Sequence, residues 1–212
     1  LQPFEMAFKR IADLTRELKN EGHDIRHIDL GGGLGVPYRG TNDVPPHPDE
    51  YAAMVKRTLG PLGCKLVLEP GRMITGNAGI LVSRVIYVKK GTLKSFIIQD
   101  AAMNDLIRPT LYEAFHDIKP VLETKDNAPR IRADFVGPVC ETGDYLGLDR
   151  EVAKPAPGDL IAVCTTGAYG AVLSSTYNSR LLIPEVLVDG DRYHVIRPRR
   201  TYEELLALDS VP

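Results

Sequence analysis

The sequence predicts two domains of different class, an α/β domain over residues 1–79 and an all-β domain with a short terminal helix over residues 80–212. Two observations support this division. The first part alternates helix-length amphipathic segments with short apolar strands, which is typical of a parallel sheet. After Gly79 the chain consists of short apolar or alternating segments bounded by turn residues, which favours an antiparallel sandwich or barrel.

The first part contains two segments with apolar residues at helical spacing, residues 4–20 and 49–59. The residues expected to face inward are Phe4, Phe8, Ile11, Ala12, Leu18, Tyr51, Met54, Val55 and Leu59. Strands are predicted over residues 25–30 and 65–69, the second as a short buried strand, and a polar, proline-rich loop over residues 39–48. These elements give the order helix, strand, helix, strand.

The second part contains seven segments that are predicted to form strands. They are residues 80–90, 94–100, 119–124, 130–138, 159–166, 180–190 and 192–198. A terminal helix is predicted over residues 201–208, where Thr201 and Glu204 fit a capping box.

Charge and cysteine content exclude several classes of protein. The formal net charge of −2 implies no general attraction to nucleic acid or to an anionic membrane surface. No apolar run approaches the roughly 20 residues that span a bilayer. Cys64, Cys140 and Cys164 are widely spaced and odd in number, which argues against a disulfide framework and suits a reducing cytoplasm. No metal site is predicted, although His23 and His27 stand at H-x-x-x-H spacing.

Three consecutive glycines follow the first strand, in the segment HIDLGGGLG. Residues such as Gly32 and Gly33 allow backbone N–H groups to surround a phosphate, although a tight turn without a ligand is the alternative. The dinucleotide pattern fits poorly, because Val36 stands where its third glycine belongs, and no Gly-Lys-Ser/Thr follows as in a P-loop. A phosphate bound here would therefore belong to neither a dinucleotide nor ATP.

A charged segment, LEPGR, follows the second strand. Glu69 and Arg72 stand at the carboxyl end of that strand, where α/β folds place ligand groups. A carboxylate can keep a heterocyclic ring nitrogen protonated, and an arginine can bind a carboxylate or phosphate with two hydrogen bonds. A structural ion pair between the two residues is the alternative.

The β domain offers further candidates. Arg108 precedes a proline that disfavours helical backbone, so we expect it to be extended near Tyr112; a surface loop with a helical turn is the alternative. Cys140 and Glu141 lie in a loop bounded by glycine and proline, and this thiol is either an inert small residue or a proton donor. Tyr169 has small neighbours that leave room for a ligand to stack, whereas a packed core tyrosine is the commoner case.

Taken in order, the motifs HIDLGGGLG, LEPGR, MNDLIRPTLY, CETGD and GAYG resemble the carboxy-terminal half of the diaminopimelate decarboxylases. These are pyridoxal-phosphate enzymes of the alanine-racemase-like class, fold type III. The resemblance covers residues 1–208 and implies the last part of a (β/α)8 TIM-like barrel followed by a β domain. It also implies decarboxylation of meso-2,6-diaminopimelate to L-lysine, the final step of lysine biosynthesis. Ornithine and arginine decarboxylases are less similar at RPTLY and at the Cys-Glu pair.

The resemblance also implies roles for individual residues. The cofactor pyridoxal 5'-phosphate would be bound by Gly32, Gly33, Glu69, Gly71, Arg72 and Tyr169. The amino-acid substrate would contact Arg72, Arg108, Tyr112, Glu141 and Tyr169. Cys140 resembles the catalytic proton donor. In the family the Cys-Glu loop serves the active site of the other subunit, so a homodimer with shared active sites is implied.

Two features of the family are absent from these 212 residues, the lysine that anchors the cofactor and the histidine that stacks on the cofactor ring. The lysine that binds the cofactor covalently lies in a segment resembling AVKAN in the first half of the barrel, and no such segment occurs here. The chain starts at Leu1 and reads as if cut from a longer protein, so we expect it to need an amino-terminal half of the same enzyme and to be inert alone. Alternatives are a decarboxylase of carboxynorspermidine, ornithine or arginine, or, in another class, a non-catalytic interaction or regulatory remnant.

Overall fold

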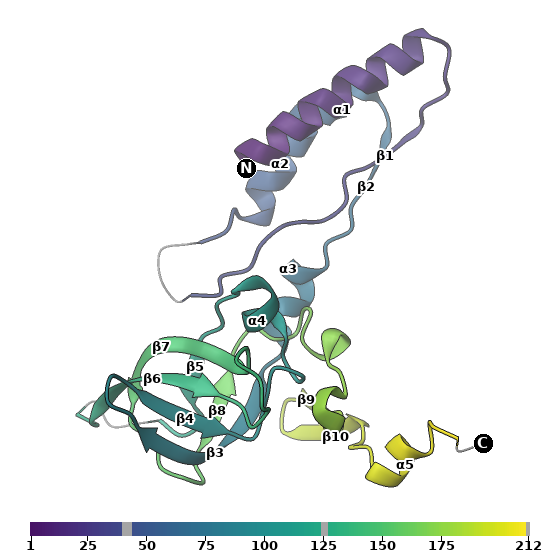
Figure 1. Ribbon diagram of the computed structural model, residues 1–212. Coiled ribbons are helices and arrows are strands. Elements are labelled where there is room, and N and C mark those ends of the chain that lie inside the picture. Colours follow the sequence, from purple (N-terminus) through teal and green to yellow (C-terminus); the bar gives the residue numbers. More distant parts are fainter. Residues whose placement is uncertain (40–43, 124–126, 211–212) are drawn as a thin grey trace. The chain divides into compact units, whose positions relative to one another are not determined.

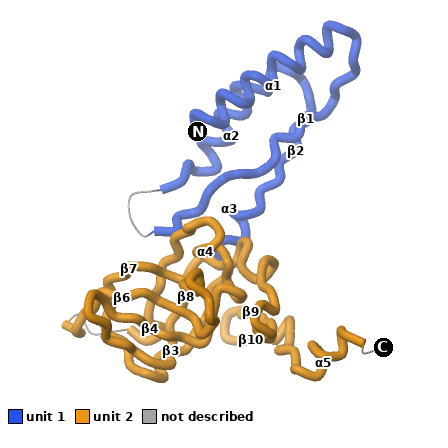
Figure 2. The backbone as a smooth tube through the Cα atoms, in the orientation of Figure 1, with its two compact units in different colours: residues 1–78 blue, residues 79–212 orange. Residues whose placement is uncertain are grey.

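The computed structural model describes residues 1–39, 44–123 and 127–210, in two compact units (Figures 1 and 2). Unit 1 is Leu1–Ala78 and unit 2 is Gly79–Pro212. The loop predicted over residues 39–48 and the segment predicted over residues 119–124 lie partly outside the described residues.

Unit 1 contains a two-stranded parallel sheet with helices before and between its strands (Figure 1). Its elements are α1 (Gln2–Asn20), β1 (His27–Asp29), α2 (Pro48–Leu59), β2 (Lys65–Val67) and α3 (Arg72–Thr75), with 3-10 turns at Gly60–Leu62 and Gly76–Ala78. The predicted order of helices and strands and their parallel pairing are confirmed.

The two long helices share one apolar cluster. All four residues predicted to face inward from α2 are buried, and the rings of Phe4 and Tyr51 meet edge to face at 5.4 Å. On α1 the buried stripe runs through Phe8, Ala12 and Thr15, so the prediction for Ile11 was wrong and its side chain is 39% exposed. A threonine at a buried helical position is tolerated here because its hydroxyl donates a hydrogen bond to the Ile11 carbonyl at 2.7 Å.

The second strand is shorter and more exposed than predicted. β2 ends at Val67, and the side chains of Val67 and Leu68 are exposed. Within the described part of unit 1 β1 is the one strand paired with β2, which leaves the other edge of β2 open. The apolar side chains that predict a buried strand are therefore exposed in the described part of unit 1.

Unit 2 is built around a nearly closed six-stranded sheet (Figure 1). Its strands are β3 (Leu81–Lys90), β4 (Ser95–Gln99), β5 (Ile118–Pro120), β6 (Arg130–Val136), β7 (Tyr145–Ala153) and β8 (Leu160–Val163), in the order β5-β8-β3-β4-β6-β7. Every strand contributes to one core of Leu81, Val85, Ile97, Ala101, Leu106, Ile118, Ala133, Phe135, Leu146, Ile161 and Val163.

The observed sheet differs from the predicted one in two respects. It is mixed, because β4 and β6 pair in parallel while the other neighbours are antiparallel. β7 was not predicted, because glycine and aspartate interrupt its apolar pattern. One of these glycines has a structural reason: a Cβ on Gly147 would lie 2.9 Å from Cδ1 of Ile118, in β5. The two edge strands thus approach each other where β7 carries no side chain.

Unit 2 also contains short helices and a separate pair of strands. A single-turn helix, α4 (Arg108–Tyr112), lies between β4 and β5, and 3-10 turns form at Ala171–Leu173 and Tyr177–Ser179. β9 (Glu185–Asp189) and β10 (Arg192–Arg197) form a separate antiparallel pair. The pair exposes the apolar side chains of Val186, Leu187, Val188, Tyr193, Val195 and Ile196.

The last helix, α5 (Tyr202–Leu206), begins with the predicted capping box. The hydroxyl of Thr201 accepts from the backbone N–H of Glu204, whose carboxylate accepts from the N–H of Thr201. The capping-box prediction is therefore confirmed.

Candidate functional site

The glycine turn of unit 1 packs directly against the strand end that carries Glu69. The N–H of Glu69 donates to the carbonyl of Gly31 at 2.8 Å, and a Cβ on Gly32 would lie 2.3 Å from the Glu69 carbonyl oxygen. Gly31 and Gly33 have φ values of +63° and +99°, a region that favours glycine. The three glycines are therefore needed for a close approach of two backbones and for two left-handed turns.

Five predicted site residues share the carboxyl-end edge of the β1–β2 pair. Gly32 and Gly33 follow β1, and Glu69 and Gly71 follow β2. The Glu69 side chain is exposed, and Arg72 is the half-buried first residue of α3. Backbone N–H groups in a left-handed turn, a carboxylate and a guanidinium are the groups that suit a phosphate and a protonated ring nitrogen. The polar groups along this edge therefore fit a phosphorylated pyridine.

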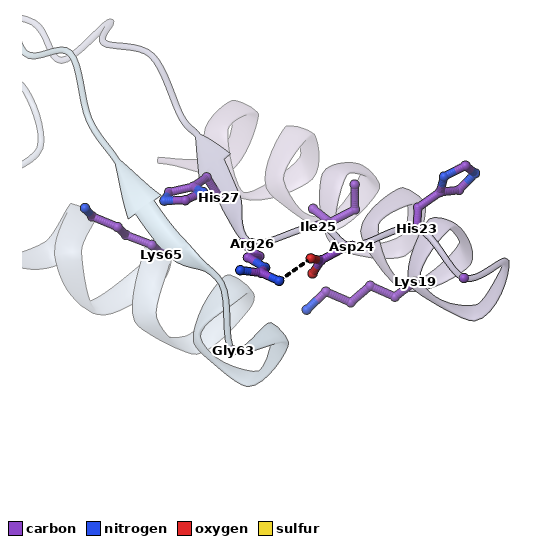
Figure 3. A pocket seen from close by; sticks show the side chains of 9 residues that line it. Lys19, His23, Asp24, Ile25, Arg26, His27, Gly63 and Lys65 are labelled. Atoms are coloured by element: carbon purple, nitrogen blue, oxygen red, sulfur yellow. Dashed lines mark ion pairs between the residues drawn. The ribbon is translucent and has the colours of Figure 1, made fainter.

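A hollow in unit 1 lies at the opposite ends of the same strands (Figure 3). It has a volume of about 770 Å³ and is lined by Lys19, Gly22, His23, Asp24, Ile25, Arg26, His27, Gly63 and Lys65. Arg26 and Asp24 form an exposed ion pair at 2.5 Å. Because His27 and Lys65 are the first residues of β1 and β2, this hollow is separate from the edge that carries Glu69.

In unit 2 the α4 helix positions Arg108 and Tyr112. Arg108 is the first residue of α4 and is only 6% exposed, so the predicted extended conformation was wrong. The helical turn of the alternative is present, but it buries Arg108 instead of leaving it on the surface. Pro109 lies in the first helical turn, where its missing N–H leaves no hydrogen bond unmade. Tyr112, at the other end of α4, is exposed.

The guanidinium of Arg108 is hydrogen-bonded to a buried histidine that sequence reasoning did not single out. Nη1 of Arg108 lies 2.8 Å from Nε2 of His116, and Nδ1 of His116 lies 2.9 Å from the carbonyl oxygen of Cys164. Burial, and to a lesser degree the charges of Arg108 and Arg150, lower the pKa of His116 to about 4. The imidazole is therefore neutral at pH 7.

The loop that carries Cys140 and Glu141 is organised by Asp144. The buried carboxylate of Asp144 accepts hydrogen bonds from the backbone N–H groups of Met103, at 2.7 Å, and Val139, at 2.6 Å. Burial raises the pKa of this carboxyl despite these hydrogen bonds. Cys140 and Glu141 themselves are exposed, so the loop presents a thiol and a carboxylate from a fixed backbone.

Two side-chain contacts connect this loop to neighbouring segments. The hydroxyl of Thr110, on α4, donates to the carbonyl of Gly143. The hydroxyl of Tyr177 donates to Oε2 of Glu141 at 3.4 Å, and the N–H of Gly143 donates to Oε1 of the same carboxylate at 3.2 Å. The structure therefore brings α4, with Arg108, beside the Cys140–Glu141 loop.

Tyr169 and Tyr177 lie on one segment, residues 165–179. Four residues of this segment that are not glycine have left-handed backbone: Thr165, Tyr169, Asn178 and Ser179, with φ between +53° and +60°. Such conformations cost about 1–3 kcal/mol each and gather at functional sites. Backbone hydrogen bonds hold this segment, among them that from Ser175 N–H to the Asn104 carbonyl at 2.9 Å.

The predicted site residues thus form two groups of five. Gly32, Gly33, Glu69, Gly71 and Arg72 belong to unit 1, and Arg108, Tyr112, Cys140, Glu141 and Tyr169 belong to unit 2. Among the described residues, no three His, Cys, Asp or Glu side chains are grouped so that they could hold a metal ion. No helix in the described ranges is long and apolar enough to cross a membrane. All three cysteines are free thiols.

Lowering the pH from 6.5 to about 4 is expected to reduce the free energy of unfolding by about 3 kcal/mol through His116 alone. The unfolded histidine takes up a proton near pH 6.5, whereas the folded one does so only near pH 4. The loss therefore begins near pH 6.5 and levels off once the pH falls below about 4. Urea unfolding over this pH range, on wild type and on His116→Gln, measures it as the difference between the two curves. If the two plots of unfolding free energy against pH were parallel, the lowered pKa of His116 would be contradicted. The raised pKa values of Asp105 and Asp144 change stability in the opposite direction, but both groups are present in both proteins, so their effect cancels in the difference.

A match to a family model defines the class of protein: the chain belongs to the family of pyridoxal-dependent decarboxylases. Residues 11–167 match the family model described as "Pyridoxal-dependent decarboxylase, C-terminal sheet domain". Within the family, the chain is similar to diaminopimelate decarboxylases. It is 50% identical over 211 residues to the enzyme of Haemophilus influenzae, covering 99% of this chain and 50% of that protein.

The relative from Zymomonas mobilis, also a diaminopimelate decarboxylase, is 46% identical over 97% of this chain and 48% of its own length. The chain thus spans about half the length of these curated relatives. The crystal structure of the Helicobacter pylori diaminopimelate decarboxylase with L-lysine aligns with a TM-score of 0.89, at 37% identity over 97% of this chain and 50% of that one. The M. jannaschii enzyme with L-lysine aligns with a TM-score of 0.93, at 35% identity over 100% and 49%. The predicted resemblance is confirmed.

A viral arginine decarboxylase, from Paramecium bursaria Chlorella virus, has the same fold. It aligns with a TM-score of 0.73 at 18% identity, over 84% of this chain and 48% of that one. The fold is therefore common to decarboxylases of different substrates.

Proposed function

We propose that the chain is the carboxy-terminal half of an enzyme that decarboxylates meso-2,6-diaminopimelate to L-lysine, the final step of lysine biosynthesis. The observation that carries this proposal is that α4, which holds the buried Arg108, lies in unit 2 beside the loop that presents Cys140 and Glu141. Diaminopimelate has an ammonium and a carboxylate at both ends. Selectivity therefore requires fixed groups of both charges at the end that does not react.

The family is pyridoxal-dependent, and pyridoxal phosphate, when bound, supplies the electron sink for the loss of CO₂. The residues of this chain that would hold it are Gly32, Gly33, Glu69, Gly71, Arg72 and Tyr169. The turn N–H groups and Arg72 suit the phosphate and carboxylate charges, and the Glu69 carboxylate suits a protonated ring nitrogen. Unit 1 would then be the last part of a (β/α)8 barrel.

The residues of unit 2 would act on the substrate. Arg108 and Tyr112 would bind the distal carboxylate, and the Glu141 carboxylate would accept hydrogen bonds from the distal ammonium. The Cys140 thiol would deliver its proton from Sγ to the substrate carbon that has lost CO₂. Tyr177, hydrogen-bonded to Glu141, would keep that carboxylate in place.

The proposed partners are an amino-terminal half that carries the cofactor lysine and a second copy of the enzyme. Exposed apolar side chains on β2 and on the β9–β10 pair support burial against further protein. The free thiols suit a cytoplasmic location.

The fold alone does not select the substrate, because an arginine decarboxylase shares it. Ornithine and arginine lack the distal carboxylate, so their binding would leave Arg108 without a substrate group to pair with. Carboxynorspermidine, a third candidate, has its one carboxylate at the reacting end, so its binding would likewise leave Arg108 without a substrate group to pair with. The choice among them therefore depends on the groups around Arg108 and Glu141.

The test compares two proteins: these 212 residues alone and the natural polypeptide in which the sequence occurs, expressed from its complete gene. CO₂ release is measured with diaminopimelate, carboxynorspermidine, ornithine and arginine, with added pyridoxal phosphate. We expect the natural polypeptide to act on diaminopimelate, and the 212 residues to be inert and to lack the absorbance band of a lysine-bound cofactor. Preference for another substrate would overturn the substrate assignment. No activity on any of them would favour a non-catalytic interaction or regulatory role.

A further inference from the structure

We propose that His116 is a positioning residue, which holds the guanidinium of Arg108 in the orientation that receives the carboxylate of the substrate. The identity of that carboxylate rests on the proposed function, whereas the positioning itself rests on the contacts of a histidine that is fully buried.

The two hydrogen bonds of His116 determine its tautomer. The Cys164 carbonyl can only accept, so Nδ1 must carry a hydrogen and donate to it across 2.9 Å. The Arg108 guanidinium can only donate, so Nε2 must be unprotonated and accept across 2.8 Å. A protonated imidazole would set two donors against each other. The geometry therefore requires a neutral Nδ1–H imidazole.

These contacts fix the guanidinium to the sheet as well as to its own helix. The backbone of Arg108 is held by α4, and its carbonyl accepts from the N–H of Ala114 at 3.3 Å. His116 lies two residues before β5, and Cys164 directly follows β8. The N–H of Cys164 donates to the carbonyl of Asp117, between His116 and β5, at 2.8 Å. The imidazole thus joins the first residue of α4 to the β5–β8 pair.

A neutral imidazole orients the guanidinium without contributing negative charge. A carboxylate in the place of His116 would orient it equally well but would cancel much of the attraction for an incoming carboxylate. Arg150, whose guanidinium lies 3.6 Å from the centre of the Phe115 ring, adds positive charge beside His116 and further opposes its protonation. The charged groups around His116 therefore favour the state that the hydrogen bonds require.

Two substitutions of His116 test its hydrogen bonds to Arg108 and to the Cys164 carbonyl separately. In His116→Gln the side-chain amide reaches the position of Nε2, so its oxygen can still accept from Arg108. In His116→Asn the amide reaches only the position of Nδ1, so it can still donate to the Cys164 carbonyl but leaves Arg108 without this acceptor. Each variant loses one hydrogen bond of a buried side chain, so a purely structural role predicts similar effects for both.

Steady-state kinetics with diaminopimelate, on the natural polypeptide, tests the proposal. We expect His116→Asn to raise KM about 10- to 100-fold with kcat changed less than about threefold, the effect of losing a hydrogen bond to a charged group. His116→Gln is expected to keep KM within about fivefold of wild type. Equal KM values for the two variants, at similar thermal midpoints, would overturn the positioning role.

A second measurement does not depend on activity. The ¹⁵N NMR spectrum of ring-labelled histidine in the natural polypeptide is expected to show His116, assigned by its absence from the His116→Gln spectrum, as the Nδ1–H tautomer at pH 7. An Nε2–H tautomer or a protonated ring would overturn the inference even if the enzyme decarboxylates diaminopimelate. Conversely, an Nδ1–H tautomer in an enzyme with another substrate would refute only the proposed function.

Discussion

Replacement of Cys140 by alanine is expected to lower kcat for diaminopimelate about 10²- to 10⁴-fold, the usual contribution of a positioned acid or base. KM should remain within a few fold of wild type, because the thiol is proposed to act on the reacting carbon and not to bind the substrate. The structure supports a chemical role over a packing role, because the Cys140 side chain is exposed on a loop whose backbone is fixed by Asp144. An inert packing cysteine would be buried.

A matched control exists in the same chain. Cys64 is half-buried in unit 1, and its thiol donates to the Ile25 carbonyl at 3.3 Å, so it is a structural cysteine. Cys64→Ala is expected to lower the thermal midpoint slightly and to leave kcat unchanged. If Cys140→Ala keeps kcat within about threefold of wild type in the natural polypeptide, the proton-donor assignment is refuted.

The elements predicted correctly are those whose local pattern agrees with their final surroundings. The four inward residues of α2 face the cluster that their spacing predicts, and the capping box of α5 is complete within four residues of chain. β7 was missed because Gly147 weakens its apolar pattern, and the reason for that glycine lies on β5. The parallel β4–β6 pair likewise depends on how distant segments meet, which strand propensity does not encode.

The site shows the same division. Cys140, Glu141 and the glycine turn were predicted as site residues because each belongs to a short motif. His116 and Tyr177 were not, because their roles come from contacts with residues far along the chain: His116 meets the Cys164 carbonyl, and Tyr177 meets Glu141. A histidine eight residues after a candidate arginine carries no local signal, and only the fold brings the two side chains together.

Replacement of Arg108 by alanine is expected to lower kcat/KM for diaminopimelate about 30- to 5000-fold, the range for removing one partner of a buried, hydrogen-bonded charge pair. Arg108→Lys should recover only part of this loss, because an ammonium keeps the charge but not the planar pair of donors. Arg132, an exposed arginine paired with Asp149 on the same sheet, supplies the control. Arg132→Ala should leave kcat/KM unchanged, as an exposed ion pair contributes little.

Arg108→Ala also removes the donor that faces Nε2 of buried His116, so some loss of folded protein is expected. The ratio of kcat/KM for diaminopimelate to that for ornithine separates the two effects. Unfolding lowers both values by the same factor and leaves the ratio unchanged. Loss of the group that pairs with the distal carboxylate lowers only the value for diaminopimelate, because ornithine has no such carboxylate. A fall in this ratio would therefore assign Arg108 to substrate selection, and an unchanged ratio would assign it to the fold.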